Sequence, residues 1–210
     1  MKINRRQFVR NLGLGTASLS MGSLISTSSC APSGDSRDKR GKVSDDDQFL
    51  FIGDDIAIAQ TEYGKVQGYL LNHVYTFLGV PYGADTSGKN RFMPPQKPEP
   101  WTDVRPAVFY GNTAPQRMEN RWPNNYGTFA DHWNYWDVSE DCLYLNVWTP
   151  GIADGKKRPV LVWLHGGGFT NGSGIEQDGY HGENISREGD IVFCSINHRL
   201  GPIGFSDLSG

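Results

Sequence analysis

The 210-residue sequence has few cysteines and no excess of positive charge. Its three cysteines, Cys30, Cys142 and Cys194, are irregularly spaced and form no Cys-x-x-Cys pair, which argues against a disulfide framework and against a zinc site. The weakly apolar stretch at residues 12–25 is too short and too polar to cross ~30 Å of hydrocarbon as a permanent helix. We see no metal or cofactor site in the sequence.

The charge is distributed unevenly along the chain. The first 29 residues carry +4, from Lys2, Arg5, Arg6 and Arg10. The remainder therefore carries −7, because the whole chain carries −3. A moderately acidic remainder gives no electrostatic reason to expect nucleic acid as a partner.

Residues 1–29 have the pattern of an export signal. Arg5 and Arg6 precede the apolar stretch, and small residues follow it. The Arg-Arg-x-Phe pattern at residues 5–8 resembles a twin-arginine signal, which implies bacterial export of a prefolded protein. An ordinary secretory signal that contains two arginines is the alternative. On either interpretation we expect a protein exported from a bacterial cytoplasm.

Cys30 follows two serines and resembles the cysteine of a bacterial lipobox, where it would be lipidated and become the new N-terminus. Thr27 departs from the usual Leu of that pattern, and ordinary signal-peptidase cleavage nearby is the alternative. Residues 30–48 have too little apolar surface to fold and predict a flexible tether before a globular part at 49–210. We expect a periplasmic or lipid-anchored protein, with membrane contact only through Cys30.

The globular part begins with short β-like runs. Residues 64–70 and 74–78 predict a strand pair around a turn at residues 72–73. Residues 79–101 are dense in Pro and Gly and predict an irregular segment. Residues 143–149 alternate between apolar and polar, which predicts a half-buried strand.

Two later runs, residues 160–164 and 191–196, are almost continuously apolar. Such runs are typical of parallel strands that are buried on both faces. The connection over residues 165–190 is long enough for a crossover between parallel strands, and we expect a short helix over residues 183–188 within it.

Three consecutive glycines follow directly after the first of these strands, in the sequence His-Gly-Gly-Gly-Phe at residues 165–169. Acyl transfer needs N–H donors aimed at the oxygen that becomes negative, and glycine lets the backbone approach that oxygen. A strand followed by His-Gly-Gly-Gly is the oxyanion loop of α/β-hydrolases. A phosphate-binding loop would need a different glycine spacing. A plain tight turn is the remaining alternative.

Four blocks, in this order, resemble the type-B carboxylesterase family, which includes cholinesterases and bacterial carboxylesterases. They are residues 77–82 (Phe-Leu-Gly-Val-Pro-Tyr), residues 139–147 (Ser-Glu-Asp-Cys-Leu-Tyr-Leu-Asn-Val), the glycine loop, and residues 197–205 (Asn-His-Arg-Leu-Gly-Pro-Ile-Gly-Phe). The resemblance implies the N-terminal part of an α/β-hydrolase fold, an α/β class in which antiparallel N-terminal strands lead into a mostly parallel central sheet.

The resemblance also implies roles for individual residues. Gly167 and Gly168 would donate backbone N–H groups to the oxyanion. Arg91 and Glu140 resemble a buried ion pair with a structural role. His165 would shape the loop, because the family's catalytic histidine comes much later in the chain.

The sequence departs from the family pattern at one cysteine position and at one histidine. Ala114 stands where the family has the disulfide partner of Cys142, so we expect Cys142 to be a free, buried thiol. Cys194, inside an apolar strand, is expected to be a packed core residue. His198 stands where the family commonly has Tyr, and no mechanism is attached to that change.

The segment between Ala114 and Cys142 is rich in aromatic residues. In the family the matching loop forms one wall of the active-site gorge. Trp122, Trp133 and Trp136 are therefore candidate substrate-binding residues, which would bind an apolar group or a cation. Packing of a long loop onto the body of the protein is the alternative.

By resemblance, the function is hydrolysis of a small-molecule carboxylic ester by a serine esterase that needs no cofactor. The 210 residues contain no Gly-x-Ser-x-Gly, so we expect the nucleophile, the acid and the base histidine to lie beyond Gly210. This chain alone is expected to be inactive, and insoluble or unstable because of open sheet edges. The alternatives are a non-catalytic binding or adhesion protein of the same fold, or an inactive truncated product.

Overall fold

The computed structural model describes residues 49–117 and 137–207. The predicted export signal, the lipidation site Cys30 and the tether up to residue 48 lie outside these ranges. Within them, no helix is long and apolar enough to cross a membrane.

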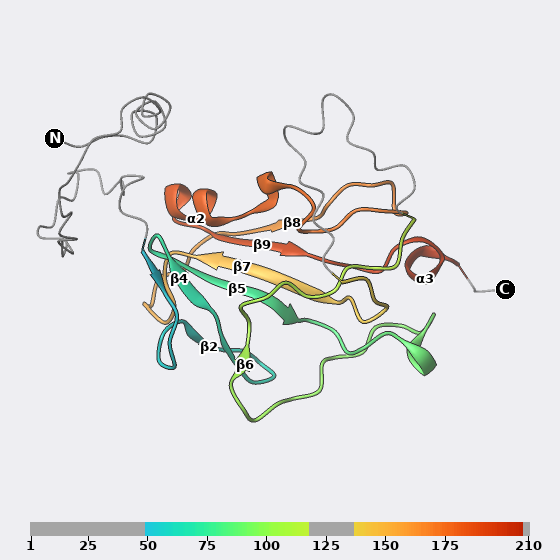
Figure 1. The fold of residues 1–210 in the computed structure, drawn as a ribbon, viewed down its shortest axis with the longest axis horizontal. Coiled ribbons are helices and arrows are strands. Elements are labelled where there is room, and N and C mark those ends of the chain that lie inside the picture. The colour runs from blue at the N-terminus through green and yellow to red at the C-terminus, as the bar shows by residue number, and fades with distance from the viewer. Residues whose placement is uncertain (1–48, 118–136, 208–210) are drawn as a thin grey trace, which may run out of the picture. The chain divides into compact units, whose positions relative to one another are not determined.

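The main sheet of the described part has six strands (Figure 1). All neighbours are antiparallel except the last two, β9 and β8, which are parallel. Antiparallel strands thus lead into a parallel pair, as expected for the N-terminal part of an α/β-hydrolase fold. In spatial order the strands are β1 (Leu50–Phe51), β4 (Tyr69–Leu71), β5 (Val74–Pro81), β7 (Tyr144–Thr149), β9 (Val192–Ile196) and β8 (Val160–Trp163).

A small second sheet and four short helical segments complete the described elements. The sheet consists of β2 (Ile58–Gln60), β3 (Lys65–Gln67) and β6 (Arg105–Pro106). The helical segments are η1 (Gly88–Asn90), η2 (Asp178–Tyr180), α2 (Glu183–Gly189) and α3 (Gly201–Phe205).

The predicted turn at residues 72–73 is confirmed, but the strand before it is not continuous. Asn72 and His73 both have positive φ, 49° and 65°, as a tight hairpin turn requires. The predicted single strand over residues 64–70 is wrong, because it divides at Gly68 into β3 and β4, which belong to different sheets. A Cβ on Gly68 would lie 2.0 Å from the carbonyl oxygen of Thr76, so the close approach of these two backbone segments requires glycine at position 68.

The two apolar runs pair in parallel as predicted, but only one of them is buried. β9 lies between β7 and β8, and its central residues are buried. β8 forms the sheet edge in the described part of the chain, and the prediction that it is buried on both faces is wrong there. All four of its residues are exposed, with Val160 64% exposed and Val162 54%. An apolar run shows that a strand is suited to burial, but its side chains are buried only where other elements pack on the faces of the sheet.

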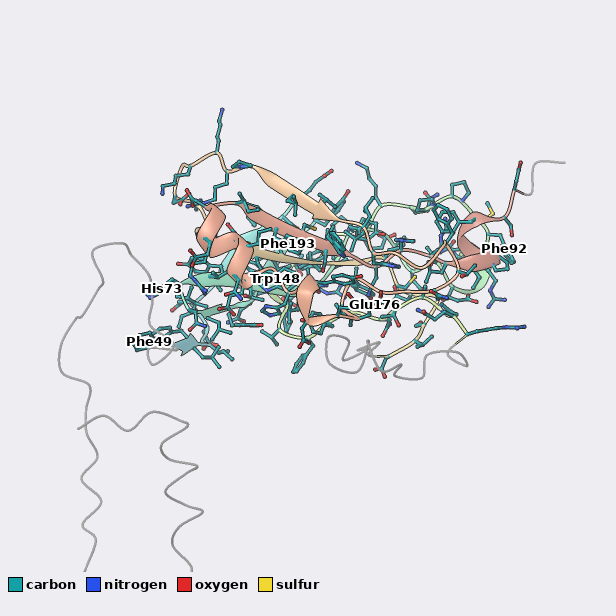
Figure 2. The ribbon with its side chains drawn as sticks, turned by 90° about the horizontal axis from the view of Figure 1, so that it is seen from above. Phe49, His73, Phe92, Trp148, Glu176 and Phe193 are labelled. Carbon is teal, nitrogen blue, oxygen red and sulfur yellow. The ribbon has the colours of Figure 1, made fainter. Side chains whose placement is uncertain are left out.

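The predicted helix in the crossover is confirmed as α2. It is fixed to the sheet by the hydroxyl of Ser186, which donates to the carbonyl oxygen of Trp148 at 3.0 Å in a buried hydrogen bond. Trp148 is 1% exposed, and its ring lies 5.8 Å from that of Phe193 between centroids (Figure 2). Together with Val74 and Leu78 these two residues form one of the core clusters.

We expect the exposed edge at β8 to make the 210-residue chain self-associate. Replacing Val162 by Lys places a charge on that edge, which opposes strand addition. The soluble fraction after centrifugation is expected to rise, and the apparent mass by light scattering to fall.

Val104→Lys is the matched control, because Val104 is 40% exposed and lies in no strand. Equal solubility of the two variants would contradict the role of the edge. A sharp cooperative thermal transition of the purified parent chain would contradict the expected instability itself.

Candidate active site

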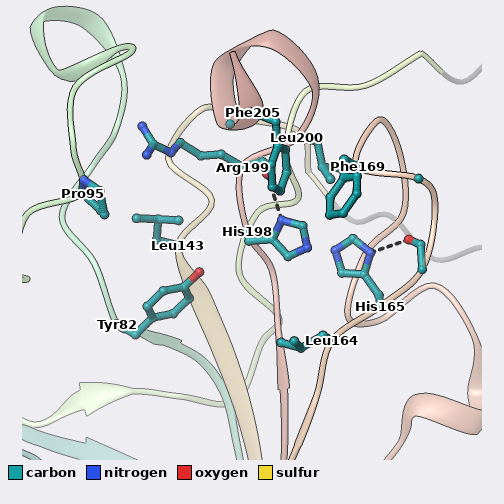
Figure 3. Close-up of a pocket in the computed structure, with 13 residues that line it drawn as sticks. Tyr82, Pro95, Leu143, Leu164, His165, Phe169, His198, Arg199, Leu200 and Phe205 are labelled. Atoms are coloured by element: carbon teal, nitrogen blue, oxygen red, sulfur yellow. Dashed lines mark hydrogen bonds between the residues drawn. The ribbon is translucent and has the colours of Figure 1, made fainter. Parts of the chain in front are cut away.

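The carboxyl ends of β8 and β9 meet at one pocket of about 570 Å³ (Figure 3). β8 ends at Trp163 and β9 ends at Ile196, so the residues that follow both strands lie at the same sheet edge. The wall is mostly apolar and includes Leu143, Leu164 and Phe205. Polar side chains from Tyr82, His165, His198 and Arg199 complete it.

The glycine loop has a backbone that other residues would not adopt readily. Gly167 has φ 119°, and a Cβ there would lie 1.8 Å from the carbonyl oxygen of Asn171. Gly168 has φ 62°, and a Cβ there would meet nothing within 4 Å, so its glycine is favoured by the dihedral angle alone. Phe169 keeps the same left-handed conformation, with φ 64°.

The backbone N–H groups of Gly167 and Gly168 find no acceptor among the described residues. The carbonyl of Gly167 is used instead, and it accepts from the N–H of Thr170 at 3.2 Å and of Asn171 at 3.3 Å. Gly168 lines the pocket together with Gly166, whereas Gly167 is exposed beside it. Two N–H groups without an acceptor among the described residues thus lie in a loop that borders an apolar pocket.

Two stacked imidazole rings brace the start of this loop. The ring centroids of His165 and His198 lie 4.5 Å apart, with an interplanar angle of 7° (Figure 3). Each Nδ1 lies beside a backbone carbonyl oxygen, at 2.8 Å from Gly166 and 2.9 Å from Arg199. A flat ring at position 198 thus supports the loop from the β9 side, and His165 lies where a loop-shaping residue is expected.

The other end of the three glycines is held by α3. The rings of Phe169 and Phe205 lie 4.7 Å apart between centroids. The N–H of Gly201 donates to the carbonyl oxygen of Phe169 at 2.7 Å. These contacts fix Phe169 in its left-handed conformation, although its side chain is 67% exposed.

Arg91 and Glu140 form an ion pair, but it is not buried as expected. Arg91 Nε lies 2.7 Å from Glu140 Oε1, and the Arg91 side chain is 49% exposed. Solvent screens such a pair, so its contribution to stability is of order 1 kcal/mol or less. Arg199, which also reaches this region, donates from Nη1 to the carbonyl oxygen of Met93 at 2.8 Å.

The remaining predicted binding residues are not in the described part. Trp122, Trp133 and Trp136 fall between residues 118 and 136, and their assignment to substrate binding stays a prediction. Among the residues that the structure describes, no group of three or more His, Cys, Asp or Glu side chains could hold a metal ion.

Two amide side chains that sequence reasoning did not single out hold the far end of the loop. Gln116 donates from Nε2 to the carbonyl oxygen of Gly172 at 2.9 Å and accepts the N–H of Gly172 at 2.8 Å. Asn197 accepts the N–H of Gly174 at 2.8 Å and donates to the carbonyl oxygen of Asn112 at 3.0 Å. Asn197 begins the last family block and Gln116 lies outside the four blocks, and no periodicity or spacing pairs either residue with the loop.

A comparison against protein families agrees with this arrangement. The arrangement consists of a parallel strand pair, a glycine loop whose N–H groups find no acceptor among the described residues, and the sequence blocks around them. Residues 55–210 match the model of the carboxylesterase family. The chain belongs to the carboxylesterase family.

Relatives in this family include enzymes from bacteria and animals. Phenmedipham hydrolase of Pseudarthrobacter oxydans is 45% identical over 148 residues, which cover 70% of this chain and 29% of the relative. Para-nitrobenzyl esterase of Bacillus subtilis (strain 168) is 39% identical over 155 residues, covering 72% and 29%. Acetylcholinesterase of Electrophorus electricus is 37% identical over 176 residues, covering 77% and 27%. The chain thus spans less than a third of the length of these relatives.

Solved carboxylesterase structures share the fold. An esterase from anaerobic Clostridium hathewayi that can hydrolyse aliphatic aromatic polyesters is similar with a TM-score of 0.69 and 38% identity, covering 78% of this chain and 31% of that chain. A thermophilic para-nitrobenzyl esterase is similar with a TM-score of 0.63 and 38% identity, covering 72% and 30%.

The two described cysteines are free and buried, as predicted. Cys142 is 0% exposed and Cys194 is 8% exposed. Burial raises the pKa of the Cys142 thiol to about 12 and that of Cys194 to about 11. Neither thiol is therefore a nucleophile near neutral pH, since the thiolate is the reactive form.

We expect iodoacetamide at about pH 8 to leave Cys142 and Cys194 unmodified in the folded protein, because both thiols are protonated and covered. After denaturation both are expected to react fully, and peptide mass spectrometry measures each site. Rapid modification of Cys142 without denaturant would show that the block at residues 139–147 does not bury it.

Proposed function

We propose that the whole protein is a carboxylic ester hydrolase and that this chain supplies its oxyanion loop. The observation that carries the proposal is the pair of N–H groups at Gly167 and Gly168 that find no acceptor among residues 49–117 and 137–207, beside an apolar pocket at the carboxyl ends of parallel strands. Relatives described as a phenmedipham hydrolase and a para-nitrobenzyl esterase, and a neighbour that hydrolyses polyesters, support this class of reaction.

In the proposed reaction, a serine outside these 210 residues attacks the ester carbonyl, and a histidine acts as base and then as acid. The contribution of this chain to the reaction is electrostatic. As the carbonyl oxygen becomes negative, it receives hydrogen bonds from Gly167 and Gly168, whose directions are already fixed by the backbone. No reorganisation of the loop is then needed when the charge develops.

The proposed substrate is a small-molecule ester with an apolar group next to the carbonyl. Leu143, Leu164 and Phe205 provide an apolar wall at the loop, which favours burial of such a group. Trp122, Trp133 and Trp136 are proposed to extend that wall, as the family resemblance implies.

Replacing Gly167 by Ala tests the oxyanion role. The added Cβ would lie 1.8 Å from the carbonyl oxygen of Asn171, so the loop must move and its donors turn away. We expect kcat/KM for p-nitrophenyl acetate to fall by about 10²–10³-fold in the whole protein, the size of effect for loss of an oxyanion donor. Gly168→Ala, which adds only backbone strain, should lower it less.

Gly155→Ala is the matched control, because Gly155 also has a positive φ, 73°, and open space around its Cβ, but it lies in a different loop. This variant should keep the activity of the parent. A parent protein with a serine elbow and no hydrolysis of any ester would favour the alternative of a binding protein. The 210-residue chain alone is expected to show no activity, because it contains no Gly-x-Ser-x-Gly.

We also propose that the protein is exported and lipid-anchored through Cys30. The twin arginines and the serines before Cys30 support this. Cys30→Ser is expected to release the protein from the membrane fraction, because lipid attachment needs the thiol. Metabolic labelling with a fatty-acid analogue, followed by fractionation, measures both effects. Unchanged labelling in the variant would contradict lipidation at this residue, and Arg5→Lys with Arg6→Lys separately tests the twin-arginine route.

A further inference from the structure

The oxyanion loop does not end with its three glycines. It continues through Gly172, which has φ 114° and is buried. A Cβ on Gly172 would lie 2.3 Å from the carbonyl oxygen of Gly166 and 2.4 Å from Nδ1 of His165. The backbone at Gly172 therefore lies directly against the first two residues of the glycine loop, and its position determines theirs.

Gly172 is held by one side chain, that of Gln116. The amide donates to the carbonyl oxygen of Gly172 at 2.9 Å and accepts its N–H at 2.8 Å, so both backbone groups of this residue are bonded by a single planar group. A third bond, from Nε2 to the carbonyl oxygen of Ala114 at 3.1 Å, orients the amide from its own segment. The separation is 56 residues in sequence, so no local structure supplies this contact.

We propose that Gln116 is a positioning residue of the oxyanion hole: its amide clamps Gly172 and thereby holds the N–H groups of Gly167 and Gly168 in place. This inference rests on the proposed function for its catalytic consequence, but the clamp itself is independent of activity. Gln116 touches no substrate in this role. It acts through Gly172, His165 and Gly166.

The amide group is matched to this task by its chemistry. It offers one donor and one acceptor in a plane, as a neighbouring β-strand would, whereas a carboxylate offers acceptors only. A carboxylate at this position would still accept the N–H of Gly172 but would face its carbonyl oxygen without a proton. When protonated, the same group regains the donor. A Gln116→Glu variant therefore tests the bond donated to the carbonyl oxygen of Gly172, because that bond can be removed and restored by changing the pH.

Two substitutions in the whole protein test the proposal. Gln116→Leu removes the amide and with it all three hydrogen bonds, and kcat is expected to fall by about ten- to a hundred-fold with KM little changed. Gln116→Glu should show a similar loss at about pH 8. Its activity relative to the parent at the same pH should rise as the pH is lowered toward about 4, near the ordinary pKa of glutamate, because the protonated form donates to Gly172.

Three ionisable groups of the described residues lie near this contact: Arg117 follows Gln116 in the sequence, His165 lies against Gly172, and His198 stacks on His165. All three are present in the parent too, so their direct effect is divided out of that ratio. The matched controls are Gln60→Leu and Gln60→Glu. Gln60 is exposed, and within the described ranges its side chain hydrogen-bonds the carbonyl oxygen of its neighbour Thr61 alone. These variants should show the parent's kcat and a relative activity that does not change with pH.

Hydrogen exchange separates failure of the clamp from failure of the proposed function. In Gln116→Leu, a peptide spanning residues 171–175 should exchange faster than in the parent, because the N–H of Gly172 loses its acceptor. A parent without esterase activity would overturn the function and leave this comparison intact. Parent-like exchange of that peptide together with parent-like kcat would overturn the role of Gln116.

Discussion

The candidate site depends on the parallel pairing of β8 with β9. In the observed register Trp163 lies opposite Ser195, so the residues that follow both strands leave the sheet at the same level. This register brings His165 and His198 into a stack at 4.5 Å and places the glycine loop beside the start of α3. A slip by one residue would turn the following side chains to the opposite face and separate the two rings. The geometry of the glycine loop is therefore a consequence of strand register.

The neighbouring strands β5, β7 and β9 are held together by buried polar contacts around one asparagine. Asn146, in the middle of β7, accepts the N–H of Gly79 at 3.0 Å and donates to the hydroxyl of Ser195 at 3.1 Å. The side chain of Asn146 thus connects β5 on one side of β7 to β9 on the other. A buried amide that lost either partner would be costly, which favours one register over the others. In the block at residues 139–147, Asn146 thus has a structural role of its own, beside that of the buried Cys142.

A second set of contacts continues this connection to the pocket. The N–H of Asn197 donates to the carbonyl oxygen of Tyr144 at 2.8 Å, and its own carbonyl accepts the hydroxyl of Tyr82 at 2.8 Å. Burial, the largest cause, raises the pKa of Tyr82 well above its usual value, so this hydroxyl remains a donor. Blocks more than a hundred residues apart in sequence therefore meet at the wall of one pocket.

Sequence patterns predicted where helices, strands and turns form better than they predicted what those elements pack against. The hairpin at Asn72 and the helix at Glu183 follow local rules of turn chemistry and periodicity, and both are present. The strand is divided at Gly68 because the segment around Thr76 approaches its backbone closely. The residue pattern of a single strand carries no information about such an approach. The exposure of Val160 is likewise a property of the surroundings, because the same apolar run would be buried if other elements covered both faces of the sheet there. Gln116 could not be selected from the sequence, since its role exists only where two distant segments meet.

The glycine loop could not keep its shape by glycine alone. Gly167, Gly168, Phe169 and Gly172 all have positive φ, so this short segment is among the least favourable backbones in the described chain. A non-glycine residue in the left-handed conformation costs roughly 1–2 kcal/mol, as at Phe169, and each glycine gives up more freedom than other residues on folding. Contacts from outside must offset these costs: the histidine stack at one end, Gly201 and Phe205 in the middle, and the amide of Gln116 at the other. Glycine makes the conformation accessible, and the surrounding side chains make it the one that is populated.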